Sequence, residues 1–162
     1  NSSLALQLLI LTACRTSEII KAQWNEVNFN DKVWIIPKER TKTSIIHRVP
    51  LSQGSMSILH EMKTRQSSNY IFEGSIIGKH LSDNAMLTFL KRHFPNINAI
   101  PHGFRSSFRD WAENRNTYSH KAIEYCLGHA IRNKTEAAYQ RDDLLEKRYL
   151  IMQDWAKYIM GN

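Results

Sequence analysis

The side chains that could carry chemistry in this sequence are a small set of basic, imidazole and phenolic groups. Two arginines, two histidines, one lysine and one late tyrosine stand apart from the apolar helical patterns. His102 and Arg105 lie three residues apart at a predicted helix start, so both project from the same face of its first turn. In chain order the candidates are Arg15, Lys42, His102, Arg105, His129 and Tyr139.

This set fits the transfer of a phosphodiester without a metal ion. Two arginines can hold the non-bridging oxygens, on which negative charge develops in the transition state, by bidentate hydrogen bonds. A lysine or a histidine can protonate the 5′ oxygen as it leaves. A tyrosine can attack and later leave again, because its phenol has a pKa of about 10, and the phosphotyrosine bond conserves the energy needed for rejoining.

The motifs around these residues resemble those of the tyrosine recombinases, the phage-integrase family. Their order and spacing carry the resemblance, which extends from Leu4 to about Tyr158, although each motif alone occurs by chance. The first arginine box of the family is usually T-G-x-R-x-x-E, the second H-x-x-R and the third L-G-H, and a hairpin like that of phage and genomic-island integrases lies between the first two. The matching segments are Thr12–Glu18, Glu39–Lys42 with His47–Ser52, His102–Arg105, Leu127–His129 and Tyr139.

The resemblance implies a role for each candidate that would bind the phosphate. Arg15 and Arg105 would hold the scissile phosphate, and His129 would donate a hydrogen bond to it. Glu18 would orient Arg15 or its neighbours. Taken alone, Arg15 is better interpreted as a helix-end partner of Glu18 and each histidine as structural, whereas the set of motifs together favours the catalytic roles.

The resemblance also implies which groups move protons and which group attacks. Lys42 would be the general acid toward the 5′ oxygen, and His102 would assist proton transfer at the tyrosine. Tyr139 would attack and form a 3′-phosphotyrosine. Lys38, Arg40 and Lys32 compete with Lys42, with Lys38 as the runner-up, and the rivals of Tyr139 are Tyr118, Tyr125 and Tyr149.

One position departs from the family pattern. Ala13 stands where the first box usually has glycine. Alanine tolerates most helix-end geometries, so we expect a small effect unless the backbone there needs a positive φ.

The composition favours a nucleic-acid partner over a membrane. The 162 residues are 42% hydrophobic and 23% charged, with a formal net charge of +7. A basic balance favours polyanions, and Arg40 and Arg48 in the predicted hairpin are candidate DNA contacts. No apolar stretch is long enough to span a membrane.

The apolar patterns and turn signals predict an α+β fold, mostly helical, with a small three-stranded antiparallel sheet. Strands are predicted at 33–36, 45–49 and 70–72. Helices are predicted from capping residues at Ser52, Ser119 and Asp143, among others. The first helix would be capped by Ser2 or Ser3.

Two cysteines, Cys14 and Cys126, lie inside apolar helical patterns and belong to no C-x-x-C pair. This favours a reducing cytoplasm over a disulfide or zinc site. The family resemblance implies that this is the bacterial cytoplasm, at the nucleoid. A zinc site from His102, Cys126 and His129 is disfavoured. No metal and no other cofactor is expected.

The resemblance implies a site-specific recombinase that integrates or excises a prophage or genomic island. Its partner would be double-stranded DNA at attachment sites, on which free monomers form a tetramer, with DNA-bending or excision proteins as candidate helpers. The chain starts without an initiator Met, so we interpret residues 1–162 as one catalytic domain from a longer integrase, with the N-terminal core-binding domain absent. Residues 143–162 carry an apolar stripe that could dock in cis or in trans. The alternatives are a type IB topoisomerase-like strand transferase, a silent DNA-binding module and a metal-dependent nuclease.

Overall fold

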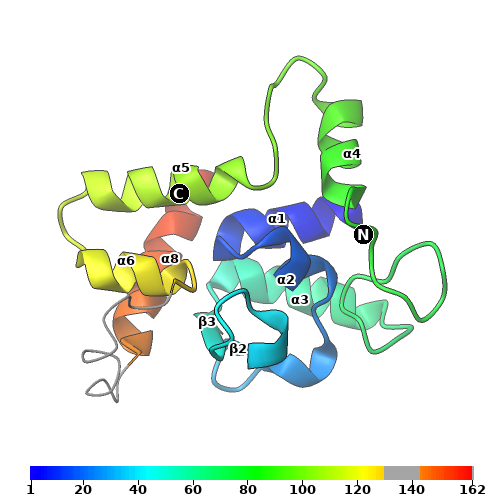
Figure 1. Ribbon diagram of the computed structural model, residues 1–162, viewed down its shortest axis with the longest axis horizontal. Helices are drawn as coiled ribbons and strands as arrows, with labels where there is room; N and C mark the ends of the chain where they lie inside the picture. Colours follow the sequence, from blue (N-terminus) through cyan, green and yellow to red (C-terminus); the bar gives the residue numbers. More distant parts are fainter. Residues whose placement is uncertain (130–142, 162) are drawn as a thin grey trace.

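The computed structural model describes residues 1–129 and 143–161, which form seven α-helices with one small sheet at the edge of the domain (Figure 1). The predicted α+β class is therefore confirmed. The helices are α1 (Ser2–Thr12), α2 (Thr16–Ile20), α3 (Gln53–Thr64), α4 (Ala85–His93), α5 (Gly103–Asn114), α6 (His120–Cys126) and α8 (Leu145–Met160). The strands are β1 (Val27–Asn28), β2 (Val33–Ile36) and β3 (His47–Pro50), and short 3₁₀ turns occupy Trp24–Glu26 and Lys38–Arg40.

The sheet is antiparallel in the order β1-β2-β3, with Trp34 opposite Val49 and Ile36 opposite His47. The predicted hairpin of β2 and β3 is thus present. The third strand predicted at 70–72 is wrong, because Tyr70 makes only an isolated bridge to Gln23 and the third strand is β1. The apolar residues of that segment are buried, but their backbone groups make single hydrogen bonds and not the repeated bonds of paired strands.

Two of the capping predictions are confirmed. Ser52 accepts a hydrogen bond from the Ser55 amide, and Ser119 accepts one from the Ala122 amide. These bonds satisfy amides that have no partner inside the helix.

The predictions for the first and last helices are wrong. Asn1, not Ser2 or Ser3, is the residue before α1, and its side chain makes no capping bond. Leu144 precedes α8 with a φ of 55°. Asp143 does not cap the helix because its carboxylate binds the guanidinium groups of Arg48 and Arg148.

The core consists of two hydrophobic clusters that meet near the C-terminal end of α1. One cluster joins α1, α2, α3, α4 and the sheet, and the other joins α5, α6 and α8 (Figure 1). Ala13 belongs to the second cluster and Cys14 to the first. The segment that leaves α1 therefore lies on the seam between the two halves of the domain.

The last helix packs on its own chain. Trp155 of α8 is buried and donates a hydrogen bond from Nε1 to the Ile10 carbonyl at 2.7 Å. Within residues 143–161, Ile151 and Trp155 of the apolar stripe are buried against the same chain, while Leu150 is exposed. Across residues 1–129 and 143–161, no helix has the length and apolarity needed to cross a membrane.

Candidate active site

The turn after α1 places Arg15 on the seam. Ala13 ends α1 with φ 50° and ψ 25°, in the left-handed region that glycine adopts freely. The condition under which alanine was expected to matter here is therefore met, because the backbone has a positive φ. Arg15 follows in extended conformation and is the residue before α2.

Glu18 holds Arg15 in this position. The Glu18 carboxylate is fully buried and accepts from the Arg15 backbone amide at 2.8 Å and from Arg15 Nη1 at 3.0 Å. One carboxylate therefore fixes both the start of α2 and the direction of the guanidinium.

The second arginine is buried beneath the first. Arg105, on α5, is only 5% exposed. Its Nη1 donates to the Ala13 carbonyl and its Nη2 to the Leu127 carbonyl, the latter at 2.8 Å. Burial lowers the pKa of the Arg105 guanidinium. These two carbonyls, which follow α1 and α6, keep it paired with main-chain acceptors, and both residues belong to the second cluster.

The turn after α6 brings His129 to the same place. Gly128 has a φ of +62°, and the His129 amide returns to the Glu124 carbonyl at 3.0 Å. His129 Nδ1 lies 2.7 Å from a carboxylate oxygen of Glu124, and Nε2 lies 3.5 Å from Arg105 Nη2. A carboxylate only accepts and a guanidinium only donates, so these partners together favour the tautomer with the proton on Nδ1.

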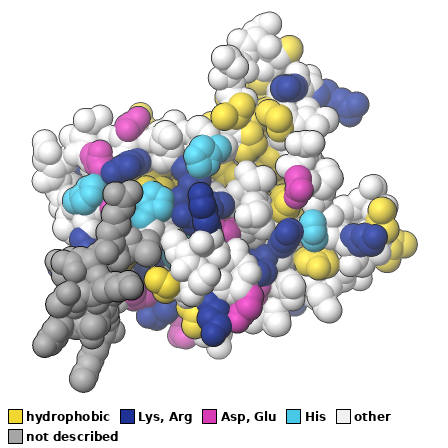
Figure 2. Space-filling model, in the orientation of Figure 1, with side chains coloured by type: hydrophobic (Ala, Val, Ile, Leu, Met, Phe, Trp, Pro, Cys, Tyr) yellow, Lys and Arg dark blue, Asp and Glu magenta, His cyan; other side chains and the backbone are white. Residues whose placement is uncertain are grey.

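Three of the six candidates therefore converge. Arg15 Nη2 donates to the Gly128 carbonyl at 3.4 Å, while Arg105 contacts His129. Basic and histidine side chains gather in the middle of the face seen in Figure 2. Two guanidinium groups and an imidazole around one turn form a site suited to an oxyanion such as a phosphate.

The other candidates stand outside this group of contacts. His102 is exposed and directly precedes α5, one turn before Arg105. Lys42 is exposed in the loop between β2 and β3. Tyr139 lies outside the described residues. The roles of all three remain predictions.

The two predicted DNA contacts differ in their surroundings. Arg40 is largely enclosed and donates from Nη2 to Glu26 Oε2 at 2.8 Å and to the Glu18 carbonyl at 3.3 Å. Arg48 is half exposed and pairs with Asp143 at 3.2 Å. Arg48 is thus the more accessible of the two for an external phosphate.

Sequence reasoning missed two residues that touch the site, Glu124 and His47. Glu124 lies five residues before His129, and its contact depends on the tight turn at Gly128. His47 occupies an inward position of β3, two residues before the buried Val49, and is itself buried. A histidine at an apolar position of an alternating strand is the signal that could have singled it out.

Two groups of side chains in residues 1–129 and 143–161 have atoms close enough to share a metal ion, and neither is the zinc set of His102, Cys126 and His129. One is the exposed group of Glu113, His120 and Glu124. Arg109 already forms salt bridges with both of its glutamates, at 3.1 and 3.2 Å. The other is the buried group of Cys14, Glu18 and His47.

Comparison with solved structures supports the same type of fold. The chain resembles the Tn1549 transposon integrase, solved in complex with transposon right end DNA, with a TM-score of 0.62 and 18% identity over 94% of this chain and 58% of that one. It also resembles XerA recombinase, with a TM-score of 0.64 and 16% identity over 93% of this chain and 56% of that one. The fold is that of a tyrosine-recombinase catalytic domain.

The sequence identifies the family. Residues 1–145 match the model of the phage integrase family, and the chain belongs to that family. It is 34% identical to prophage integrase IntA of Escherichia coli (strain K12) over 93% of this chain and 37% of that protein. It is 31% identical to the integrase of Enterobacteria phage P4 over 98% of this chain and 40% of that protein. The chain thus spans about two fifths of the length of these relatives.

Proposed function

We propose that this chain is the catalytic domain of a site-specific recombinase, which cuts and rejoins double-stranded DNA to integrate or excise a prophage or genomic island. The observation that carries the proposal is the convergence of Arg15, Arg105 and His129 at the Gly128 turn. Family membership and the integrases among its relatives support it.

In the proposed reaction the Tyr139 oxygen attacks the scissile phosphorus. A bond forms from the tyrosine oxygen to phosphorus, and the bond from phosphorus to the 5′ oxygen breaks. The product is a 3′-phosphotyrosine and a free 5′ hydroxyl. Attack by another 5′ hydroxyl reverses these steps and rejoins the strand, so no external energy source is consumed.

Arg15 and Arg105 stabilise the charge that builds up on the two non-bridging oxygens. Their side chains are already fixed by Glu18 and by backbone carbonyls, so little reorganisation is needed when a phosphate arrives. His129, held by Glu124 through Nδ1, presents Nε2 to the same site, where it donates to a phosphate oxygen only as an imidazolium. Lys42 gives its proton to the leaving 5′ oxygen, and His102 assists proton transfer at the tyrosine.

Further expectations concern the whole protein. We propose that a tetramer forms on two attachment sites, from chains that are monomeric when free, with accessory DNA-bending or excision proteins. Because the family's core-binding domain precedes the catalytic domain, residues 1–162 alone should bind DNA weakly and in a salt-sensitive manner. Nanomolar binding that is insensitive to salt in a shift assay would contradict this.

A covalent-adduct assay tests the mechanism. The protein is incubated in EDTA with a nicked duplex that carries its attachment core, taken from the ends of the mobile element, and adducts are resolved on a denaturing gel. Wild type should form an adduct, and Tyr139→Phe should form none. Tyr149→Phe is the matched control, since Tyr149 lies on α8, and it should retain the adduct.

The absence of an adduct from wild type on DNA that it binds would call for the longer protein with its preceding domain. If that protein also formed no adduct, the chain would be a silent DNA-binding module. An adduct that required a divalent metal would instead indicate a metal-dependent nuclease.

A further inference from the structure

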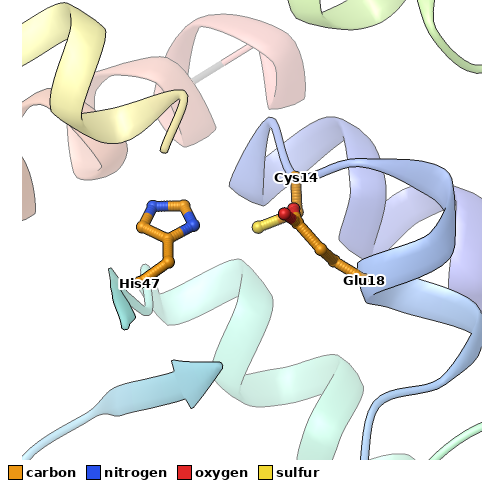
Figure 3. A group of neighbouring side chains, drawn as sticks. All are labelled: Cys14, Glu18 and His47. Carbon is orange, nitrogen blue, oxygen red and sulfur yellow. The ribbon is translucent and has the colours of Figure 1, made fainter. Parts of the chain in front are cut away.

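Three buried side chains lie behind Arg15, on the side away from solvent. His47 extends from β3 toward Cys14 and Glu18, and the three side chains place their nearest ligand atoms within 4.8 Å of one another (Figure 3). The residue types could suit a cation, but their bonding does not. Both oxygens of Glu18 already accept hydrogen bonds from Arg15, and burial raises the pKa of the Cys14 thiol to about 12.

The charges around this group also oppose a cation. Burial and, after it, the positive charges of Arg148, Arg15 and Arg105 together lower the pKa of His47 to about 3. A site surrounded by three guanidinium groups repels another positive charge. The imidazole is therefore neutral at physiological pH, and its function is to be sought in its shape and contacts.

The His47 ring lies against Gly128. A Cβ atom added to Gly128 would lie 2.7 Å from His47 Nδ1 and 2.9 Å from Cε1, well inside contact distance. The ring therefore packs directly against the glycine backbone, which is also held at a φ of +62°. The Tyr125 backbone, at the other end of the same turn, also faces the ring, although neither ring nitrogen has a hydrogen-bond partner among the described residues.

Gly128 is the point on which the phosphate-binding groups depend. Its carbonyl accepts from Arg15, its amide donates to the Tyr125 carbonyl at 3.1 Å, and His129 is the next residue. Any shift of this turn moves His129 and removes one acceptor of Arg15. His47 is the side chain that supports the turn from the hairpin.

We propose that His47 is a positioning residue for strand transfer. Its neutral ring, carried on β3, sets the place of the Gly128–His129 turn and so the spacing between His129 and Arg15. The inference rests on the proposed function, because it assigns His47 a part in that reaction. It also couples the hairpin, whose loop carries Lys42, to the phosphate-binding turn.

The first test compares His47→Ala with Val49→Ala, a substitution of another buried residue on the same strand. At saturating nicked DNA, His47→Ala should slow adduct formation by on the order of 10- to 100-fold, because small misplacements of reacting groups have effects of this size. DNA affinity should stay the same. Val49→Ala should lower thermal stability and keep the wild-type rate. Equal rates for His47→Ala and wild type would overturn the proposal.

A double-mutant cycle tests the contact itself. Gly128→Ala should slow adduct formation in wild type, since the added Cβ would collide with the ring. In the His47→Ala background the same change should have a smaller effect, leaving the cost of the positive φ. Effects that multiply independently would overturn the proposal.

Hydrogen exchange supplies a readout that does not depend on activity. His47→Ala should speed exchange at the amides of Gly128 and His129 and leave the amides of α3 unchanged. Unchanged exchange at these two amides would overturn the positioning role, whatever the adduct assay gives. If neither wild type nor the longer protein formed an adduct but exchange responded as expected, the proposed function would fail while the support of the turn by His47 stood.

Discussion

Glu18 accepts two hydrogen bonds from Arg15, one from the backbone amide and one from the guanidinium, through separate oxygens of one fully buried carboxylate. The backbone bond orients the first turn of α2, and the side-chain bond aims the arginine at the Gly128 turn. The stability of the helix start and the geometry of the proposed phosphate site therefore depend on the same two oxygens.

Glu18→Gln should impair both. Removing the charge from one partner of a buried ion pair costs about 3 kcal/mol of unfolding free energy. The misdirected arginine should also slow adduct formation by on the order of tenfold or more. Urea unfolding and the adduct assay measure the two effects. The control is Glu61→Gln, which removes an exposed pair with Arg65 worth less than about 1 kcal/mol. A wild-type rate in Glu18→Gln would show that Arg15 is aimed without it.

Substitutions at Ala13 should report the left-handed backbone. Ala13→Gly removes a Cβ strain of about 1–2 kcal/mol, but the greater freedom of the unfolded chain offsets about 0.4–1 kcal/mol of this, so the free energy of unfolding should rise by between about 0 and 1.6 kcal/mol. Ala13→Val adds a branched side chain at a fully buried site and should cost about 3 kcal/mol. Urea unfolding measures both. Equal stability of the Val and Gly variants would argue against a positive φ at this position.

Protonation of His47 should make the protein acid-sensitive. The folded pKa is about 3, against an ordinary value of 6.5, so below pH 6.5 the unfolded chain binds a proton that the folded chain does not. The stabilisation is full above pH 6.5 and is lost as the pH falls toward 3. This group alone should make the protein about 2 kcal/mol less stable at pH 5 than at pH 7.

His47→Asn should flatten that dependence, whatever its stability at pH 7. Urea unfolding at several pH values between 7 and 5 measures the slope. His120→Asn, which changes an exposed histidine, should keep the wild-type slope. Parallel slopes for His47→Asn and wild type would show that another group dominates the acid response.

Arg148→Met should loosen the start of α8. The buried Arg148 guanidinium donates to the Arg48 carbonyl and to the carbonyl and carboxylate of Asp143. Leaving buried acceptors without a donor costs about 1–3 kcal/mol each, so the melting temperature should fall. Lys147→Met, which changes the exposed neighbour, should melt like wild type. Calorimetry separates the two, and an unchanged melting temperature for Arg148→Met would mean that water replaces the lost donor.

Much of the fold could be predicted from local signals. Ser52 and Ser119 cap α3 and α6 because a hydroxyl at that position satisfies a free amide, a rule that acts over three residues. The third strand could not be predicted in this way. Residues 70–72 have the composition of a strand, but strand pairing depends on which strand edge is available. The edge of β2 that β3 leaves open is occupied by β1.

The residues of the candidate site likewise divide into those that sequence motifs identify and those that depend on tertiary packing. The order of the motifs identified Arg15, Arg105 and His129, whose contacts confirm that they lie together. Glu124 and His47 were missed because they act through a turn whose path is set by tertiary packing. Asp143 is of a residue type that often caps helices, but it binds Arg48, 95 positions earlier in the chain.

Three of the acceptors that hold the two arginines are the carbonyls of Ala13, Leu127 and Gly128. Every amino acid supplies a carbonyl, so no coding change can delete these acceptors; it can only move them. A mutational screen of this domain should therefore recover inactive variants that keep every catalytic side chain. Such variants should map to positions that bend the backbone, and restoring activity in them would require a compensating change of shape rather than the return of a lost functional group.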